Sequence, residues 1–399
     1  MKTIFIVPTL ALAIGLASPL AQAEETVNFW FHFDNPDNPM DELVEAFEAE
    51  NPDIKIEAEN IPWDSYYDNL YTAIVAGDAP DAAMVKMFAQ PRLIEMGALE
   101  PLDSYIESWE GRAEVLENLY ALTTATDGTA YYLPVQYVVL YLYYRADMFA
   151  EAGLEPPQTC EDFRSAAMAL SDGDTYGFGF RGGKGGHDHW ASLALSDNAN
   201  FRGGDLMSDE VIAGTQFVMD LFAADKVFPP SAPNDGFKEI ISAFQAGKTA
   251  MTIHHIGSSA SMVEALGDKV SATVVPDCNG GRWTAFGDES TAIFSTASDK
   301  DAAWKWISFL SSKGYNATFN EATGQLPVTK SDSEEWTLHE KRFVDATLDS
   351  LPYANLLPNL EATSDFVNTV WPVNMQRALI GEITAEEMNK AIEDLYNPE

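Results

Sequence analysis

The stretch whose residue types most suggest chemistry is the glycine-rich run at 181–190, which follows an expected strand. Its glycines allow the backbone to fold closely against a ligand. Arg181 and Lys184 add positive charge to an otherwise acidic chain, which leaves room for an anionic sugar. The run lacks the spacing of Gly, Lys and Ser or Thr that nucleotide-binding loops use for phosphate. We therefore expect a ligand loop here, but no nucleotide site.

Two histidine pairs, His187 with His189 and His254 with His255, could supply imidazole ligands to a metal. Their spacing is not diagnostic, and no carboxylate is tied to either pair by pattern. The sequence therefore predicts no metal site.

A glycosidase would need two carboxylates on opposite sides of a sugar cleft. Asp34 and Glu289 could be nominated, but a chain with 62 acidic and 23 basic residues offers such pairs by chance. The sequence has no serine nucleophile elbow, HExxH motif or P-loop. We expect no catalytic residue and no cofactor, and keep a periplasmic carbohydrate-active enzyme as the alternative class.

The N-terminus predicts export. Lys2 precedes an apolar run at 4–20, and the small-x-small sequence at 21–23 is typical of signal peptidase cleavage. We expect a signal peptide at 1–23 and a soluble periplasmic product, since no later run approaches the roughly 20 apolar residues of a spanning helix. The formal net charge of −39 argues against binding nucleic acid or anionic lipid.

The elements that position these residues alternate between strand and helix. In the first part, the pattern predicts strands at 27–33, 54–56 and 81–85, with helices at 40–50 and 63–76 between them. Later segments repeat the alternation, with strands at 137–144, 176–180, 250–253 and 272–275 and helices at 160–170, 209–222 and 301–310. This order favours an α/β fold with a largely parallel sheet. The length suggests two domains, and because no flexible linker divides them, we expect strands that cross between them.

Seven separated blocks resemble the sugar-type extracellular solute-binding proteins of ABC importers (family 1), whose members include maltose- and glycerol-phosphate-binding proteins. The blocks are 76–81, 93–103, 133–136, 142–149, 243–251, 323–328 and 376–382. The resemblance implies a type II periplasmic binding protein with two hinge-linked lobes and a central ligand cleft. By this analogy lobe one comprises 24–132 plus 277–325, and lobe two comprises 133–276 plus 326–399.

The resemblance also implies a function. We expect the periplasmic substrate-binding component of an ABC transporter, a monomer that captures a sugar, polyol or sugar derivative by hinge closure. Its partners would be that small ligand and the permease subunits in the inner membrane.

A sugar presents apolar C–H faces and a rim of hydroxyls, so its cleft needs aromatic platforms and fixed polar groups. Such groups gather in the loops that follow the strands of an α/β lobe. His32 and Asp34 follow the first expected strand, Trp63 the second and Phe88 the third. For Trp63 and Phe88, packing against a neighbouring helix stays an equal alternative.

Further candidates come from the hinge strand and lobe two. Gln136 and Tyr141 lie on the hinge strand, where Val138 stands at a position that many relatives fill with an acidic residue. Trp190 resembles the aromatic that relatives place over the ligand from lobe two. We prefer His255 to His254 because it lies nearer the loop end. The full expected ligand-binding set is His32, Asp34, Trp63, Phe88, Gln136, Tyr141, His187, Trp190, Arg202, His255, Trp283, Asp288 and Trp371.

The two cysteines, Cys160 and Cys278, could form a disulfide in an oxidising compartment or remain as two buried thiols. Because the expected lobe boundaries place them in different lobes, we favour two unpaired thiols.

Overall fold

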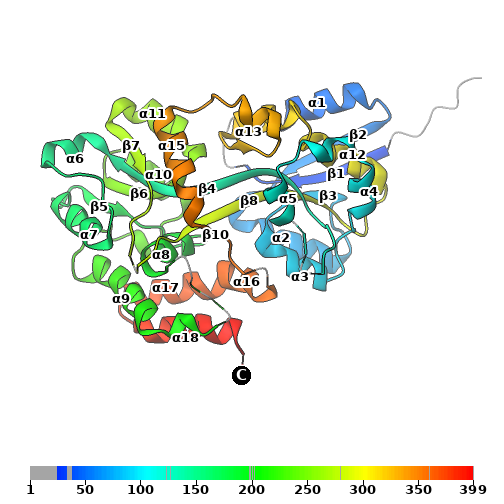
Figure 1. The fold of residues 1–399 in the computed structure, drawn as a ribbon. Helices are drawn as coiled ribbons and strands as arrows, with labels where there is room; N and C mark the ends of the chain where they lie inside the picture. Colours follow the sequence, from blue (N-terminus) through cyan, green and yellow to red (C-terminus); the bar gives the residue numbers. More distant parts are fainter. Residues whose placement is uncertain are drawn as a thin grey trace, which may run out of the picture.

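Figure 1 shows the computed structural model of the chain, which describes residues 25–33, 38–122, 124–125, 127–196, 199, 201, 203–278, 280–358 and 360–398. Within these ranges no helix is long and apolar enough to cross a membrane. The predicted signal peptide at 1–23 lies outside the described residues. Two groups of elements, at opposite ends of the view in Figure 1, are joined by long strands.

The first group, which we call the first lobe, is built on the parallel strands β1 (Glu25–Phe31), β2 (Ile54–Asn60) and β3 (Ala82–Val85). β1 lies between the other two strands. α1 (Met40–Glu50) follows β1 and α2 (Trp63–Ala76) follows β2, as the sequence predicts.

Helix α2 illustrates how local sequence sets these bounds. Its buried residues Tyr66, Tyr67 and Leu70 are spaced so that one face of the helix packs on the lobe. The helix ends at Gly77, whose φ of 75° is a left-handed conformation that glycine adopts without strain.

Two long strands run between the lobes. β8 (Thr284–Ile293) pairs antiparallel with β3 through 290–293 and with the first half of β4 (Leu133–Arg145) through 286–291. The second half of β4 pairs with strands of the other lobe. β4 and β8 therefore cross from one lobe to the other, as the sequence predicts for the hinge strand.

The second lobe is built on β5 (Tyr176–Gly179), β6 (Thr249–His255) and β7 (Val270–Thr273). β6 pairs antiparallel with β4 and parallel with β5, and β7 pairs antiparallel with β4. The helices of this lobe that precede β8 are α6 (Ala146–Ala152), α7 (Cys160–Ala169), α8 (His187–Ala194), α9 (Asp209–Ala223), α10 (Phe237–Gln245) and α11 (Ser259–Leu266).

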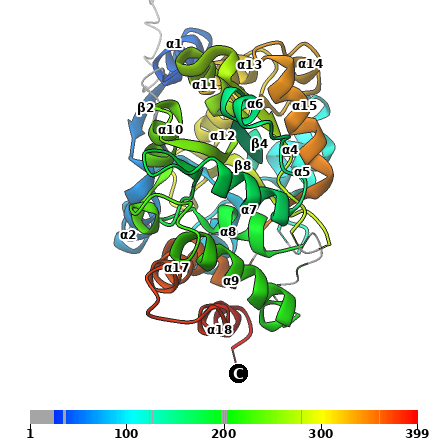
Figure 2. The same ribbon diagram turned by 90° about the vertical axis from the view of Figure 1, so that its left-hand side faces the viewer.

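The remaining helices include several that the sequence analysis does not predict. α17 (Trp371–Leu379) and α18 (Ala385–Tyr396) close the chain, and α18 lies beside α9 in both views (Figures 1 and 2). The others are α3 (Gln90–Glu95), α4 (Asp103–Ser108), α5 (Glu117–Leu122), α12 (Lys300–Leu310), α13 (Tyr315–Thr323), α14 (Lys330–Glu334), α15 (Lys341–Ser350) and α16 (Glu361–Asp365).

β9 (Leu326–Pro327) lies near the expected return to the second lobe and pairs with β4 at Gln136 and Tyr137. Beyond β9, the backbone N–H of Lys330 donates to the carbonyl oxygen of Glu114 in the first lobe at 2.8 Å. The exact lobe boundaries stay predictions.

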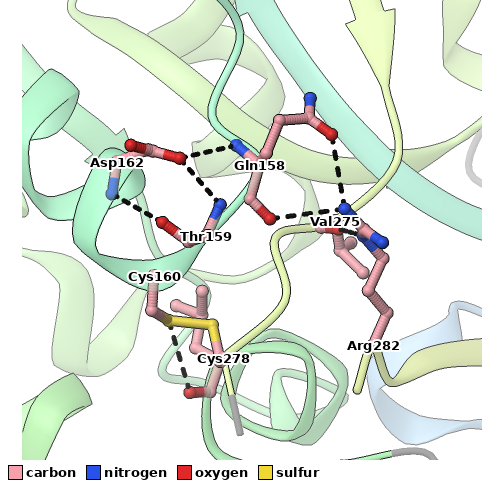
Figure 3. The surroundings of a disulfide bond; sticks show 8 residues. Gln158, Thr159, Cys160, Asp162, Val275, Cys278 and Arg282 are labelled. Atoms are coloured by element: carbon pink, nitrogen blue, oxygen red, sulfur yellow. Dashed lines mark hydrogen bonds between the residues drawn. A yellow bond between two sulfur atoms is a disulfide. The ribbon is translucent and has the colours of Figure 1, made fainter. Parts of the chain in front are cut away.

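The cysteines form a disulfide, Cys160–Cys278, so the expectation of two thiols is wrong (Figure 3). The physical reason is local pairing. Thr159 and Asp277 form a parallel β-bridge, and the backbone N–H of Cys160 donates to the carbonyl oxygen of Asp277 at 3.0 Å. Cys278 therefore lies against α7 of the second lobe, although the expected boundary assigns it to the first.

Candidate ligand-binding site

A cavity of about 920 Å³ lies between the two lobes, where β4 and β8 cross. Its first-lobe wall consists of the loops that follow the three parallel strands. His32 follows β1, Trp63 begins the helix after β2, and residues 86–88 follow β3. The carboxyl ends of parallel strands meet at one edge of a sheet, which brings these side chains together.

The opposite wall comes from the second lobe. Arg181, His187 and Asp188 belong to the loop after β5 and the first turn of α8, while His254 and His255 end β6. Five of the six histidines of the chain line the cavity, His32 and His189 among them.

The crossing strands form the floor. The side chains of Gln136, Val138 and Leu140 on β4 line the cavity, together with Gly287 and Glu289 on β8. In both strands these positions alternate along the chain, because successive side chains of a strand point to opposite faces.

Glu289 carries a buried negative charge, with only 4% of its surface exposed. Lys86 Nζ makes an ion pair with Glu289 Oε1, and His32 Nε2 lies 3.2 Å from Oε2. Burial raises the pKa of the Glu289 carboxyl, but the charge of Lys86 and the contact with His32 outweigh burial and hold this pKa below its usual value. Glu289 is therefore an ionised acceptor at neutral pH.

Three histidines of the second-lobe wall, His189, His254 and His255, are held neutral because burial lowers their pKa values. The backbone N–H of Arg181 donates to His189 Nδ1 at 3.2 Å, so Nε2 carries the proton and donates to the carbonyl oxygen of Ile253 at 2.9 Å. Burial lowers the pKa of His189 to about 3 and that of His254 well below its usual value. In His255, Nδ1 accepts from the backbone N–H of Gly257 at 3.2 Å, so Nε2 is its protonated nitrogen.

A second carboxylate with a lowered pKa, that of Asp188, lies on the second-lobe wall. Asp188 Oδ1 lies 3.1 Å from His187 Nε2. Burial raises the pKa of Asp188, but His187 and the positive charge of Arg181 outweigh burial and lower this pKa below its usual value. Both walls thus place a cation near a carboxylate.

Aromatic side chains complete the lining. The rings of Trp63 and His32 have centroids 4.8 Å apart, as do those of Phe88 and Tyr67. Trp63 and Phe88 are both half-buried, so each packs against its neighbours and also lines the cavity. Phe237 and Trp283 provide apolar surface from elements outside the first lobe.

Three expected ligand residues lie in the core instead. Trp190 is fully buried because α8 packs against α9. The indole Nε1–H of Trp190 donates to Thr215 Oγ1 at 2.9 Å. Tyr141 is on the face of β4 opposite Gln136, and its hydroxyl contacts that of Tyr143 at 2.9 Å. Trp371 is fully buried where α17 begins. These corrections leave Tyr141, Trp190 and Trp371 with structural roles.

The structure brings together at the cavity His32, Trp63, Phe88, Gln136, His187, His255 and Trp283. Asp34, Arg202 and the side chain of Asp288 fall outside the described part of the structure. Which lining residues touch a ligand stays a prediction.

The expected ligand-binding set omits Lys86, Asp188, Phe237, Glu289 and Gln325, all of which line the cavity. Of these, the sequence analysis named Glu289 only as a carboxylate that a glycosidase could use. Glu289 could have been found from the alternation of side chains along β8. Because Gly287 and Glu289 are two residues apart on the strand, both lie on the face that lines the cavity. Gln325 has no comparable local signal, because its Nε2 meets His255 Nδ1, 3.1 Å away, only through folding.

Among the described residues there is no group of three or more His, Cys, Asp or Glu side chains arranged to hold a metal ion. The lining therefore offers hydrogen bonds, charge pairs and aromatic surface, the groups that recognise a small polar organic molecule.

The family model described as bacterial extracellular solute-binding protein matches residues 34–317. The chain belongs to this family. The predicted two-lobed α/β architecture is confirmed.

Relatives of known name support this membership. The chain is 26% identical over 365 residues to the mannitol-binding protein of Pseudomonas aeruginosa. This alignment covers 85% of this chain and 82% of the relative. It is also 26% identical to the sn-glycerol-3-phosphate-binding periplasmic protein UgpB of Escherichia coli, over 80% of this chain and 78% of the relative. An ABC transporter solute-binding protein of Thermotoga lettingae, bound with α-D-tagatose, shares the fold with a TM-score of 0.83, 24% identity and coverage of 93% and 99%.

Proposed function

We propose that this solute-binding protein captures a sugar or polyol in the periplasm and delivers it to the permease subunits of an ABC importer. The observation that carries the proposal is the cavity between the lobes, which combines half-buried aromatic rings with ionised and neutral hydrogen-bonding groups. Aromatic rings suit the C–H faces of a sugar, and fixed polar groups suit its hydroxyls. The names of relatives that bind mannitol and tagatose agree with this substrate class.

Capture requires the lobes to move. Because the cavity walls belong to different lobes, a ligand between them contacts both walls only when the lobes are closed, which favours the closed state. Lys184 of the second lobe already reaches α2 of the first, where Nζ donates to the carbonyl oxygen of Asp64 at 3.3 Å and lies 3.5 Å from Asp68 Oδ2. We infer that this contact forms as the cleft closes.

Delivery follows from the same movement. A permease that recognises surfaces of both lobes would distinguish the closed, loaded form from the open one. We propose that the protein acts as a monomer, since one chain supplies both walls of the cavity.

Isothermal titration calorimetry tests the function with D-mannitol, D-tagatose and maltose as probes, beside a dipeptide and spermidine. We expect at least one sugar or polyol to bind and the dipeptide and spermidine not to bind. Binding of only the latter two would refute the substrate class. Mass spectrometry of the ligand after denaturation separates capture from catalysis, because an enzyme would return a cleaved product.

A further inference from the structure

Glu289 occupies the central position of the candidate site. It lies on β8, one of the two crossing strands, and stands opposite Gln136 of β4 in their antiparallel register. Both side chains line the cavity and are buried. A ligand held between the lobes can therefore reach the Glu289 carboxylate from the cavity.

The carboxylate of Glu289 keeps acceptor capacity after its protein contacts are counted. Lys86 pairs with Oε1, and His32 lies near Oε2 without the alignment of a hydrogen bond. A carboxylate offers about four lone-pair directions. Lys86 and His32 thus fix the carboxylate in place, and it can still accept hydrogen bonds from the cavity side.

The charge of the lining does not favour an anion. Its described cations are Lys86, Arg181 and Lys238, and its described anions are Asp188, Glu264, Glu289 and Glu321. In the buried part, Lys86 is paired with Glu289, and Arg181 acts on Asp188. A sugar phosphate would add about −1.5 to −2 charges beside these carboxylates.

We propose that Glu289 is the residue that selects an uncharged, polyhydroxylated ligand over a phosphorylated one. This inference rests on the proposed function and narrows it to neutral sugars and polyols. Ligand hydroxyls donate to the Glu289 carboxylate, which Lys86 and His32 hold in position. The same carboxylate repels a phosphate group and occupies the lysine that would otherwise pair with it.

The test compares each neutral probe with its own phosphate ester by calorimetry on the unaltered protein. The pairs are D-mannitol with mannitol 1-phosphate, D-tagatose with tagatose 6-phosphate, and maltose with maltose 1-phosphate. We expect the neutral member to bind at least tenfold more tightly. Tighter binding of a phosphate ester overturns the inference and leaves the proposed function standing. Failure of all six probes counts against both.

Glu289→Gln tests the residue itself. The variant loses a hydrogen bond from the ligand to a charged acceptor. Its affinity for the neutral probe that binds best should therefore fall about 10- to 100-fold. With the negative charge of residue 289 removed, the positive charge of Lys86 should at the same time tighten binding of the matching phosphate ester. Unchanged affinity for both members of the pair would overturn the assignment to Glu289.

The matched control is Glu100→Gln, which alters the Lys300–Glu100 pair, 2.6 Å apart in the first lobe and outside the cavity lining. It should leave both affinities unchanged. Thermal unfolding of each variant confirms folding. If Glu289→Gln does not fold, the comparison of neutral and phosphorylated probes on the unaltered protein decides the inference.

Discussion

Trp190 forms one end of a buried chain of hydrogen bonds that links three helices. Its Nε1–H donates to Thr215 Oγ1 at 2.9 Å, and the Thr215 hydroxyl donates to Asn389 Oδ1 at 2.8 Å. Asn389 Nδ2 in turn donates to the carbonyl oxygen of Leu206 at 2.8 Å. The indole therefore connects α8 to α9 and α18, and its role is to fix their packing.

Trp190→Ala should lower the free energy of unfolding by about 3–5 kcal/mol, because it leaves a cavity in the core and removes a partner of Thr215. Trp190→Phe keeps most of the volume and should cost less. Urea unfolding monitored by circular dichroism measures both effects. A Trp190→Ala variant with normal stability and weakened sugar binding would return this residue to the ligand site.

At the scale of elements, strand and helix bounds follow from local pattern, and so does part of the site. The loops after β1, β2 and β3 could be located because β1 and β3 are short apolar runs and β2 begins with apolar residues that alternate with a lysine. His32, Trp63 and Phe88 lie in or next to these loops. Tyr141 was wrongly assigned although strand alternation places it on the face opposite Gln136, since the two residue numbers differ by an odd number along β4.

Other parts of the site depend on contacts between distant segments. Lys86 and Glu289 meet only because β3 and β8 are neighbours in the sheet, and no pattern within either segment specifies that pairing. The disulfide is a similar case, since Cys278 reaches Cys160 through the bridge between Thr159 and Asp277.

The disulfide anchors the segment that leads into β8 (Figure 3). It closes a loop across a sequence separation of 118 residues, so a double Cys160→Ser, Cys278→Ser variant should lose about 2–5 kcal/mol of stability. Differential scanning calorimetry measures the lower Tm. The unaltered protein treated with a reductant should show the same shift. An unchanged Tm in both would mean that hydrogen bonds alone hold the segment.

The contact between Lys184 and α2 joins the lobes at their surface. Lys184→Ala should weaken sugar binding by less than about 1 kcal/mol, roughly fivefold, because the ion pair is exposed. Calorimetry at low and high ionic strength should show the loss shrinking with salt. Lys341→Ala, which removes the exposed pair with Asp345 within one helix, serves as the control. An equal effect of the two variants would exclude a contribution of Lys184 to closure.

At the scale of the whole molecule, two charge effects act as the pH falls. The formal net charge is −39, so the excess carboxylates of the folded protein repel one another. Protonation of these carboxylates relieves the repulsion. The reference pKa values of Asp and Glu side chains lie near 4, so we expect this relief of repulsion mainly below about pH 5.5. Buried histidines act in the opposite direction and at higher pH.

His189 and His254 are buried, and burial lowers the pKa of His189 to about 3 and that of His254 well below its usual value. In the unfolded chain a histidine has a pKa of about 6.5. Below that pH the unfolded state binds protons that the folded state does not, so stability is full above pH 6.5 and falls towards the folded pKa.

We therefore expect the free energy of unfolding to fall between pH 6.5 and 5.5, by up to about 1.4 kcal/mol per pH unit for each of the two histidines. Urea titrations at half-unit steps measure this slope. Repeating the series in high salt is the control, because salt screens surface repulsion but reaches buried groups much less. A slope that persists in salt assigns the effect to the buried histidines. If the two histidines stay neutral in the folded state, only the unfolded chain binds protons at them, and unfolding becomes more favourable as the pH falls. A free energy of unfolding that stays constant or rises from pH 6.5 to 5.5 would therefore contradict their neutral state.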